Sequence, residues 1–218
     1  MPENNSYPHP TLTKVLGRPT NVTLKLLQQE INTNAMSIVT NRGGGNHGHL
    51  ALVIPATEYT IQAGVGNYFL TLTNPGNTPT HAPNATGPQI TEINRQFKVD
   101  VKEFQHHNKV KNELKQQIIE AVDDKYINTL SDNLFGYANI TVLTILQHLK
   151  TTYGAITPDD LAKNDKELQR EWDPQTEIED LWTHQEDCQQ YAAAGTNPIT
   201  QLTVIIKTLQ LIENTGIF

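Results

Sequence analysis

The sequence predicts an all-α protein, and three observations support this fold class. Apolar residues recur at spacings of three and four along several stretches, so each stretch would present one apolar face as a helix. Three segments begin with a capping residue followed by proline, at Thr157, Asp173 and Asn197. Glycines stand near the expected helix ends. Together these signals predict compact helical bundles.

The first forty residues are expected to hold a flexible tail and one helix. Residues 1–10 are polar and contain prolines, which predicts the tail. Thr20 is placed to cap a helix that ends near Met36. One face of that helix would carry Leu24, Leu27, Ile31 and Ala35.

The next fifty residues contain few helix signals. Residues 41–48 (NRGGGNHG) are expected to form a flexible loop. Residues 49–54 are either extended or the lead-in to a short helix at 55–63. The weak alternation at 67–73 fits a short strand or an extended arm. Residues 74–89, with four prolines and two glycines, predict a long Pro/Gly-rich loop.

A long helical region is expected from about Gln89 to Leu130. Two apolar stripes define it: Ile90, Ile93, Phe97, Val101 and Phe104, and then Val110, Leu114, Ile118 and Val122. The stripes are out of phase, which predicts a kink or a change of buried face near His106–Asn108. Leu134-Phe135-Gly136 is expected to be a turn.

The C-terminal stretch reads as a series of short helices. Val142, Ile145, Leu146, Leu149 and Tyr153 form an apolar stripe within 137–153. Gly154 is expected to stop that helix in the left-handed conformation. Helices opened by Thr157-Pro158, Asp173-Pro174 and Asn197-Pro198 would follow. The residues between the first stop and the next start, Gly154, Ala155, Ile156 and Thr157, are the candidate hinge.

Charge and composition suggest two domains. The chain has 218 residues, enough for one large or two small domains, and a net charge of −7. Residues 157–218 hold 12 acidic and four basic residues, so that segment carries −8 and the first 156 residues carry +1. The composition becomes acidic near Gly154–Thr157. We therefore expect an N-terminal domain at 1–156 and a C-terminal domain at 157–218.

No residue pattern predicts catalysis, a metal or a cofactor. The Gly-rich stretch around His47 and His49 lacks the phosphate-loop pattern, and no cysteine or acidic residue lies close by. His106 and His107 are expected on a solvated helix face. Cys188, the only cysteine, lies on an apolar helix side and is interpreted as a buried small residue. The chain is therefore not expected to be an enzyme.

The remaining expectations concern location and nucleic acid. No signal peptide or transmembrane segment is recognised, which predicts a cytoplasmic protein without a membrane partner. The acidic C-terminal part should not bind nucleic acid through phosphate contacts. Five lysines give the long helix a basic side: Lys98, Lys102, Lys109, Lys111 and Lys115. A solvated surface is the preferred interpretation of that side, and weak RNA contact is the functional alternative.

Four stretches resemble, in their order, the Gag protein of copia-type LTR retrotransposons, of the type found in polyproteins of protists such as diatoms. They are LTKVLGRPTNVTLKLLQQEINTNAMSIVTNRGGGNHGHLAL (12–52), NELKQQIIEAVDDKYINTL (112–130), GYANITVLTILQHLKTTYGAITPDDL (136–161) and WDPQTEIEDLWTHQEDCQQYAAAG (172–195). The similarity covers nearly the whole chain, and its order and extent carry the resemblance. No single motif is chemically diagnostic.

The resemblance implies a retroviral-capsid-like protein of two helical domains that assembles with copies of itself into hexamer- and pentamer-based shells around element RNA. Residues 136–154 would be the last helix of the N-terminal domain, and 173–195 would resemble the major homology segment. Related Gag proteins continue beyond a point like Thr215–Phe218 with another helical piece and a basic or Cys/His tail. The second domain is therefore expected to be truncated, and RNA binding to be weak.

The sequence thus predicts a structural Gag (capsid) protein that forms virus-like particles. The alternative is a domesticated, Gag-derived helical adaptor that acts as a small oligomer in protein–protein interaction. The candidate residues for the C-terminal core or for assembly are Ile178, Leu181, Trp182, Tyr191, Leu202, Ile206 and Leu209. Trp182 in particular is expected to anchor the C-terminal core.

Overall fold

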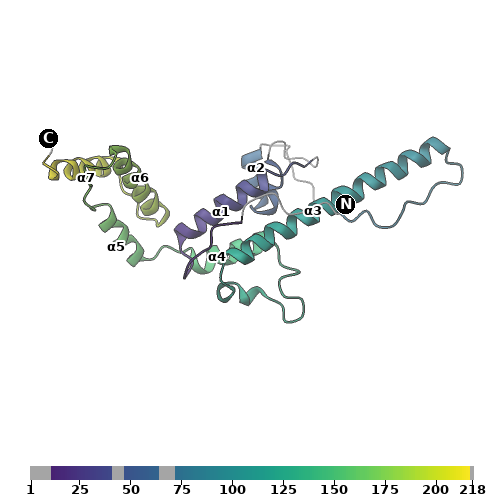
Figure 1. Ribbon diagram of the computed structural model, residues 1–218, viewed down its shortest axis with the longest axis horizontal. Coiled ribbons are helices and arrows are strands. Elements are labelled where there is room, and N and C mark those ends of the chain that lie inside the picture. Colours follow the sequence, from purple (N-terminus) through teal and green to yellow (C-terminus); the bar gives the residue numbers. More distant parts are fainter. Residues whose placement is uncertain (1–10, 41–46, 64–71, 217–218) are drawn as a thin grey trace. The chain divides into compact units, whose positions relative to one another are not determined.

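The computed structural model describes residues 11–40, 47–63 and 72–216. Within these ranges the chain is 63% helical, with seven α-helices and no β-strand, which confirms the predicted all-α class. By its internal contacts the chain divides into two compact units between Tyr153 and Gly154 (Figure 1). Each unit is described by itself below.

The described residues of the first unit form four α-helices and three short 3₁₀-helices. They are α1 (Asn21–Met36), η2 (Leu50–Leu52), α2 (Ala56–Ala63), α3 (Gly87–Ala121), η3 (Asp124–Tyr126), η4 (Asn128–Leu130) and α4 (Val142–Tyr153). The second unit contains α5 (Pro158–Glu167), α6 (Ile178–Ala194) and α7 (Gln201–Asn214).

Helix α1 begins where the sequence predicts. The Thr20 hydroxyl accepts a hydrogen bond from the Thr23 N–H (3.3 Å), and the Thr20 N–H donates to the Thr23 hydroxyl (2.9 Å). This reciprocal pair satisfies two of the N–H groups that a helix start leaves without partners. The helix buries the predicted residues Leu24, Leu27, Ile31 and Ala35, and also Asn34.

Asn34 is a polar residue inside the core, and its partner lies on α3. The Asn34 Nδ2 donates to Gln117 Oε1 at 3.0 Å, and both side chains are buried. Because a buried amide without a partner costs about 1–3 kcal/mol, this pair favours one register of α1 on α3.

The segment after α1 folds back on the end of that helix. The His49 N–H donates to the Ala35 carbonyl at 2.8 Å. Gly48 has a φ of +48°, and a Cβ there would clash with Met36 O and lie 2.6 Å from Ile38 O. Gly48, the last residue of the loop predicted at 41–48, is buried in a turn. Residues 41–46 of that loop, and most of the strand or arm predicted at 67–73, lie outside the described residues.

Helix α3 has two halves that differ in burial. No residue of the helix before His107 is buried, so the first predicted stripe stays at or near the surface. The second stripe is buried through Val110, Leu114 and Ile118. The predicted change of buried face near His106–Asn108 thus coincides with the start of core contact, and the helix continues through it.

The α-helix ends at Ala121, and the helical region predicted to reach Leu130 continues only as the short 3₁₀-helices η3 and η4. Val122 has an extended backbone (φ −113°, ψ 134°), and the Ala121 carbonyl accepts a hydrogen bond from the Val15 N–H at 2.8 Å. The Asp123 carboxylate then accepts from the Lys125 N–H at 3.1 Å, which starts η3. A remote segment and a local side chain together supply the termination.

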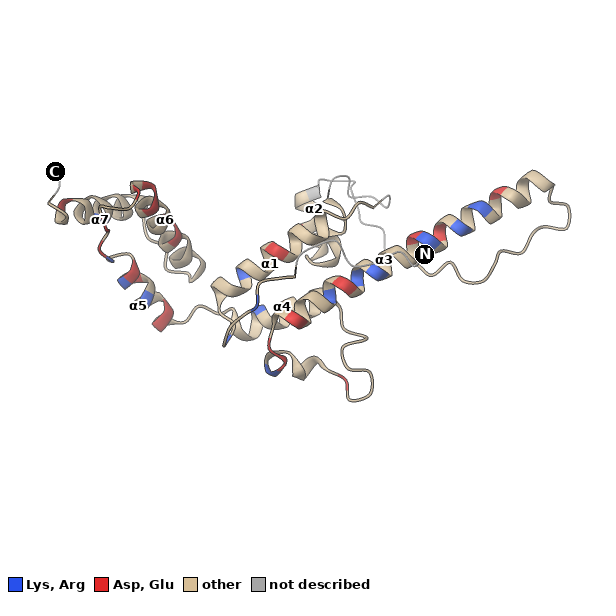
Figure 2. Cartoon of the chain, viewed as in Figure 1, with Lys and Arg blue, Asp and Glu red and all other residues tan. Residues whose placement is uncertain are grey.

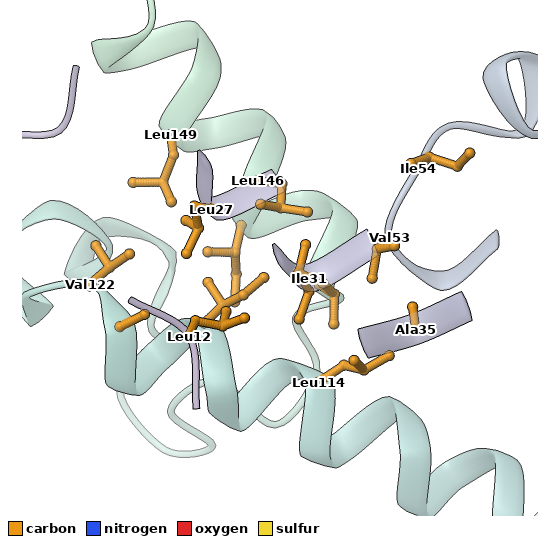
Figure 3. Packing of buried hydrophobic residues seen from close by; sticks show 14 of the residues in the cluster. Leu12, Leu27, Ile31, Ala35, Val53, Ile54, Leu114, Val122, Leu146 and Leu149 are labelled. Carbon is orange, nitrogen blue, oxygen red and sulfur yellow. The ribbon is translucent and has the colours of Figure 1, made fainter. Parts of the chain in front are cut away.

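The core of the first unit lies among α1, α3 and α4 (Figure 3). Buried side chains in it include Leu12, Leu27, Ile31, Leu114, Val122, Leu146 and Leu149. Helix α4 buries Val142, Ile145, Leu146 and Leu149 as predicted, but it begins at Val142 instead of near Tyr137. The Thr141 hydroxyl accepts from the Thr144 N–H at 3.1 Å and so caps this later start.

The predicted turn at 134–136 is confirmed. The Asp132 carboxylate accepts hydrogen bonds from the N–H groups of Leu134 (2.8 Å) and Phe135 (2.9 Å). Gly136 closes the turn with a φ of +54°, a conformation that favours glycine.

In the second unit, only the first helix start lies where the sequence predicts it. Thr157 caps α5: its hydroxyl accepts from the Asp160 N–H at 3.2 Å, and its N–H donates to the Asp160 carboxylate at 3.0 Å. The expected starts at Asp173 and Asn197 are wrong by several residues. The Asp173 carboxylate accepts from the Gln175 N–H at 2.9 Å and forms a separate turn, and α6 begins only at Ile178.

Helix α7 begins at Gln201 because the Thr200 hydroxyl, which accepts from the Thr203 N–H at 3.2 Å, provides the cap. The expected ends near Gly195 and Gly216 are confirmed. Gly154 follows the last residue of α4, yet it does not adopt the predicted positive φ.

Ile156, a member of the candidate hinge, packs inside the second unit. A Cβ on Gly195 would lie 2.6 Å from Leu161 Cδ2 and 2.9 Å from Ile156 Cγ2. The lack of a side chain at Gly195 therefore lets Ile156 and Leu161 approach the end of α6 closely.

Candidate self-association surface

The second unit is small, and its buried residues come from α6, α7 and the turn after α5. Its buried apolar residues are Leu168, Leu181, Cys188, Ala192, Val204 and Leu211. Gln185 is fully buried among them, and its Nε2 donates to the Leu168 carbonyl at 3.2 Å. With so few buried side chains, this unit has little apolar surface with which to stabilise its fold alone.

Helix α7 has two faces of opposite exposure. Val204, Thr208 and Leu211 are buried against the unit. On the other side, Leu202, Ile205, Ile206 and Leu209 are 67%, 38%, 47% and 50% exposed. Their spacing of three and four places these four residues in one stripe, which we call the α7 stripe.

Helix α7 does not follow the usual arrangement in an isolated domain, in which a helix buries its more apolar face. Its buried face carries Thr208, whose hydroxyl must donate back to the Val204 carbonyl at 2.8 Å to find a partner. Its exposed face carries four large aliphatic side chains. A helix normally turns its more apolar face to the core, so the α7 stripe has the composition of a buried surface.

Lys207, which follows Ile206 of the stripe in the sequence, forms an ion pair within the second unit. Its Nζ lies 3.1 Å from the Asp165 carboxylate of α5. Figure 2 shows acidic and basic residues interspersed along α3 and α5, and acidic residues on α6. The stripe itself contains no charged side chain.

The structure separates the predicted core or assembly residues into two groups. Leu181 is buried. Trp182 and Tyr191 are half-buried, and Ile178, Leu202, Ile206 and Leu209 are exposed. Trp182, expected as the anchor of the core, is therefore less buried than Leu181 beside it and than Leu168. Adjacent helix positions differ by about 100°, so Leu181 and Trp182 lie on different faces of α6 and differ in burial.

The one cysteine does not form a reactive site. Cys188 is buried, as interpreted from the sequence, with its Sγ 3.8 Å from His184 Nε2. Burial, followed by the charges of Glu167 and Asp187, raises the pKa of the thiol. A thiol held in its protonated form is a poor nucleophile.

Three histidines that the sequence interpretation kept apart come together in the first unit. His49 is buried, its Nδ1 lies 3.0 Å from the Ile38 carbonyl, and its ring lies near those of His106 and His107. His107 is also buried, so the expectation of a solvated face is wrong for this residue and fits only the exposed His106. Sequence spacing could not reveal this cluster, because it depends on the segment at Gly48 and His49 folding back on the end of α1, which places the His49 ring near His106 and His107 of α3.

The described residues contain no group of three or more His, Cys, Asp or Glu side chains arranged to hold a metal ion. None of the described helices combines the length and the hydropathy that a membrane span requires. Comparisons with protein-family models, with curated proteins and with solved structures found no match to this chain.

Proposed function

We propose that this chain is a structural capsid subunit of the Gag type, which assembles with copies of itself into closed particles through the α7 stripe. The observation that carries the proposal is the inverted α7: four large aliphatic side chains stand exposed on the face opposite its buried Val204, Thr208 and Leu211. Such a surface is expected to be covered in the working assembly.

Two further features support the proposal. The chain forms two compact units, and a shell-forming subunit needs rigid bodies that contact several neighbours. The resemblance of the four stretches to copia-type Gag proteins supports the same role. No side-chain constellation in the described residues favours an enzymatic function, and the proposed subunit requires no cofactor.

The proposed RNA partner would contact the first unit, because the segment 157–218 carries −8. Lys98 and Lys102, on the exposed half of α3, are exposed basic side chains that would contact the phosphate backbone in this proposal. The contact would be weak and sensitive to salt.

The test compares two leucine-to-aspartate variants. Leu202→Asp places a charge in the α7 stripe, and Leu16→Asp, at a leucine 86% exposed in the first unit, is the matched control. At about 1 M NaCl, where repulsion between the acidic segments is screened, light scattering over a concentration series and negative-stain electron microscopy should show large particles for the parent and for Leu16→Asp. Leu202→Asp should remain a small species with an unchanged circular dichroism spectrum.

Assembly of Leu202→Asp to the same extent as the parent would remove the α7 stripe from the proposal. A parent chain that stays a small species of fixed size at every concentration would favour the alternative, an adaptor derived from Gag.

A further inference from the structure

The first unit contains a cavity that the proposed capsid function does not use. Its volume is about 420 Å³, and residues of η2, α2, α3 and the start of α4 line it. Ala51, Leu52, Val142 and Leu143 give it an apolar wall. A cavity of this size falls within the range of small-molecule sites, about 300–1,000 Å³.

Residues that carry three kinds of hydrogen-bond donor line this cavity, and the first is a tyrosine. Tyr59 lines the cavity, and the residue is only 3% exposed. Its buried hydroxyl has no hydrogen-bond partner among the described residues. Leaving a buried hydroxyl without a partner costs about 1–3 kcal/mol, so a ligand atom that accepts its hydrogen bond would recover that free energy.

The second donor is the ammonium of Lys111. Lys111 lines the cavity one helical turn after His107 on α3. It forms no ion pair or hydrogen bond with the described residues. Burial is the largest cause of the lowered pKa values of His107 and Lys115, and the positive charge of Lys111 contributes to both as a smaller cause. Lys115 donates to the carbonyls of Tyr137 and Ala138 and so stays occupied.

The third is the N-terminus of α4, a helix of 12 residues. The Thr144 N–H donates to the Thr141 hydroxyl and the Ile145 N–H to the Thr141 carbonyl. The N–H groups of Val142 and Leu143, which both line the cavity, make no hydrogen bond to the described residues. Open N–H groups and the helix dipole together favour a bound anion.

We infer that this cavity binds a small amphipathic carboxylate. Its carboxylate would accept from Lys111, the Tyr59 hydroxyl and the first N–H groups of α4, and its apolar part would cover Leu52, Val142 and Leu143. A single ammonium matches a single negative charge, which favours a carboxylate over a phosphate dianion. The inference stands apart from the capsid proposal, because the α7 stripe belongs to the other unit.

Calorimetric titration of the full-length chain with hexanoate, hexanol, acetate and inorganic phosphate tests the inference. Hexanoate should bind at least about tenfold more tightly than the other three probes, since only it supplies both the charge and the apolar part. In ¹H–¹⁵N correlation spectra, hexanoate should shift the amide signals of Val142 and Leu143.

Two variants locate the binding. Lys111→Met and Tyr59→Phe should each weaken hexanoate binding, by about tenfold or more for Lys111→Met, in line with the loss of a hydrogen bond to a charged group. Lys98→Met, on the exposed half of α3 and outside the cavity, is the matched control and should bind as the parent does. Tyr59→Phe should melt no lower than the parent, because the lost hydroxyl has no partner.

Three results would overturn the inference. They are the absence of hexanoate binding at millimolar concentrations, equal affinity for hexanol and hexanoate, and an equal loss of affinity in Lys98→Met and Lys111→Met. Binding of phosphate or acetate as tight as that of hexanoate would also contradict it, by showing an anion site without an apolar part.

Discussion

The imidazole rings of His49 and His107 stack inside the first unit, with their centroids 5.8 Å apart and their planes at 30°. Both side chains are buried, and the exposed His106 lies 5.7 Å from His49 between ring centroids. Burial lowers the pKa of His107 to about 4, with smaller contributions from His49, Lys111 and His106. Burial also lowers the pKa of His49, against the opposing effect of its Ile38 carbonyl contact.

The pH dependence of stability follows from these shifts. Above about pH 6.5, the ordinary histidine value, neither the folded nor the unfolded chain holds the protons. Between about 6.5 and 4 the unfolded chain binds protons that folded His107 does not. The free energy of unfolding should therefore decrease as the pH is lowered through that window, by up to about 1.4 kcal/mol per pH unit for each such group. Urea unfolding at pH 7.5 and 5.5 measures this loss.

A pair of variants isolates the buried histidine. His107→Gln should reduce the difference in unfolding free energy between the two pH values, because it removes a group that titrates only in the unfolded chain. His106→Gln, at the exposed neighbour, should change the difference much less, because His106 makes only the smallest contribution to the lowered pKa of His107. A parent protein equally stable at both pH values would contradict the interpretation.

Gly48→Ala should destabilise the first unit severely. A Cβ at Gly48 requires an unfavourable positive φ, which costs roughly 1–2 kcal/mol, and it also meets the carbonyl oxygens at the end of α1. Gly76→Ala is the control, since Gly76 has a φ of +75° but no atom within 4 Å of the added Cβ. The melting temperature should drop much more for Gly48→Ala, and equal drops would mean that the segment after α1 can move away.

Leu181→Ala should cost more than Trp182→Ala. Leu181 is buried in the second unit, and truncating a buried leucine costs about 2–5 kcal/mol, whereas Trp182 is half-buried and loses less contact. Chemical unfolding followed by circular dichroism at 222 nm compares the two variants. A larger loss in Trp182→Ala would restore the tryptophan as the main anchor of this unit.

Assembly through the α7 stripe should increase with salt. Contacts between copies of a segment that carries −8 cost free energy through repulsion. The screening length falls from about 10 Å at 0.1 M salt to about 3 Å at 1 M, while apolar contacts are little weakened. We expect small oligomers in dilute buffer and capsid-like particles as NaCl approaches about 1 M, measured by light scattering and electron microscopy.

Acidification is expected to act on the same charges as pH falls toward about 5, but it also protonates the histidine cluster once the chain unfolds. Salt is therefore the cleaner variable. Particles that form at low salt and dissolve at high salt would mean that contacts between opposite charges hold them together.

Local sequence signals determined the helices and some of their ends. The threonine caps at Thr20 and Thr157 and the helix ends near Gly195 and Gly216 were predictable, because caps and glycine stops act over a few residues. The apolar stripes of α1, of α4 and of the second half of α3 were predictable for the same reason, since helical spacing is a local property.

The tertiary structure decided where helices end and which apolar faces are covered. Helix α3 stops at Ala121, where Val15, remote in sequence, donates to its last carbonyl. The α7 stripe and the first stripe of α3 have the spacing of core faces, yet they remain exposed or half-buried. Periodicity shows that a face is apolar, but which face is buried depends on partners that a local pattern does not contain.

The cavity beside Tyr59 and the stacking of His49 on His107 are also tertiary results. Each brings together residues from separate elements, so neither leaves a motif in the sequence. The sequence by itself determined an all-α chain with capped helices and an acidic C-terminal part. Contacts between distant segments decided which of its histidines, tyrosines and leucines are buried, because burial is a property of packing and not of spacing.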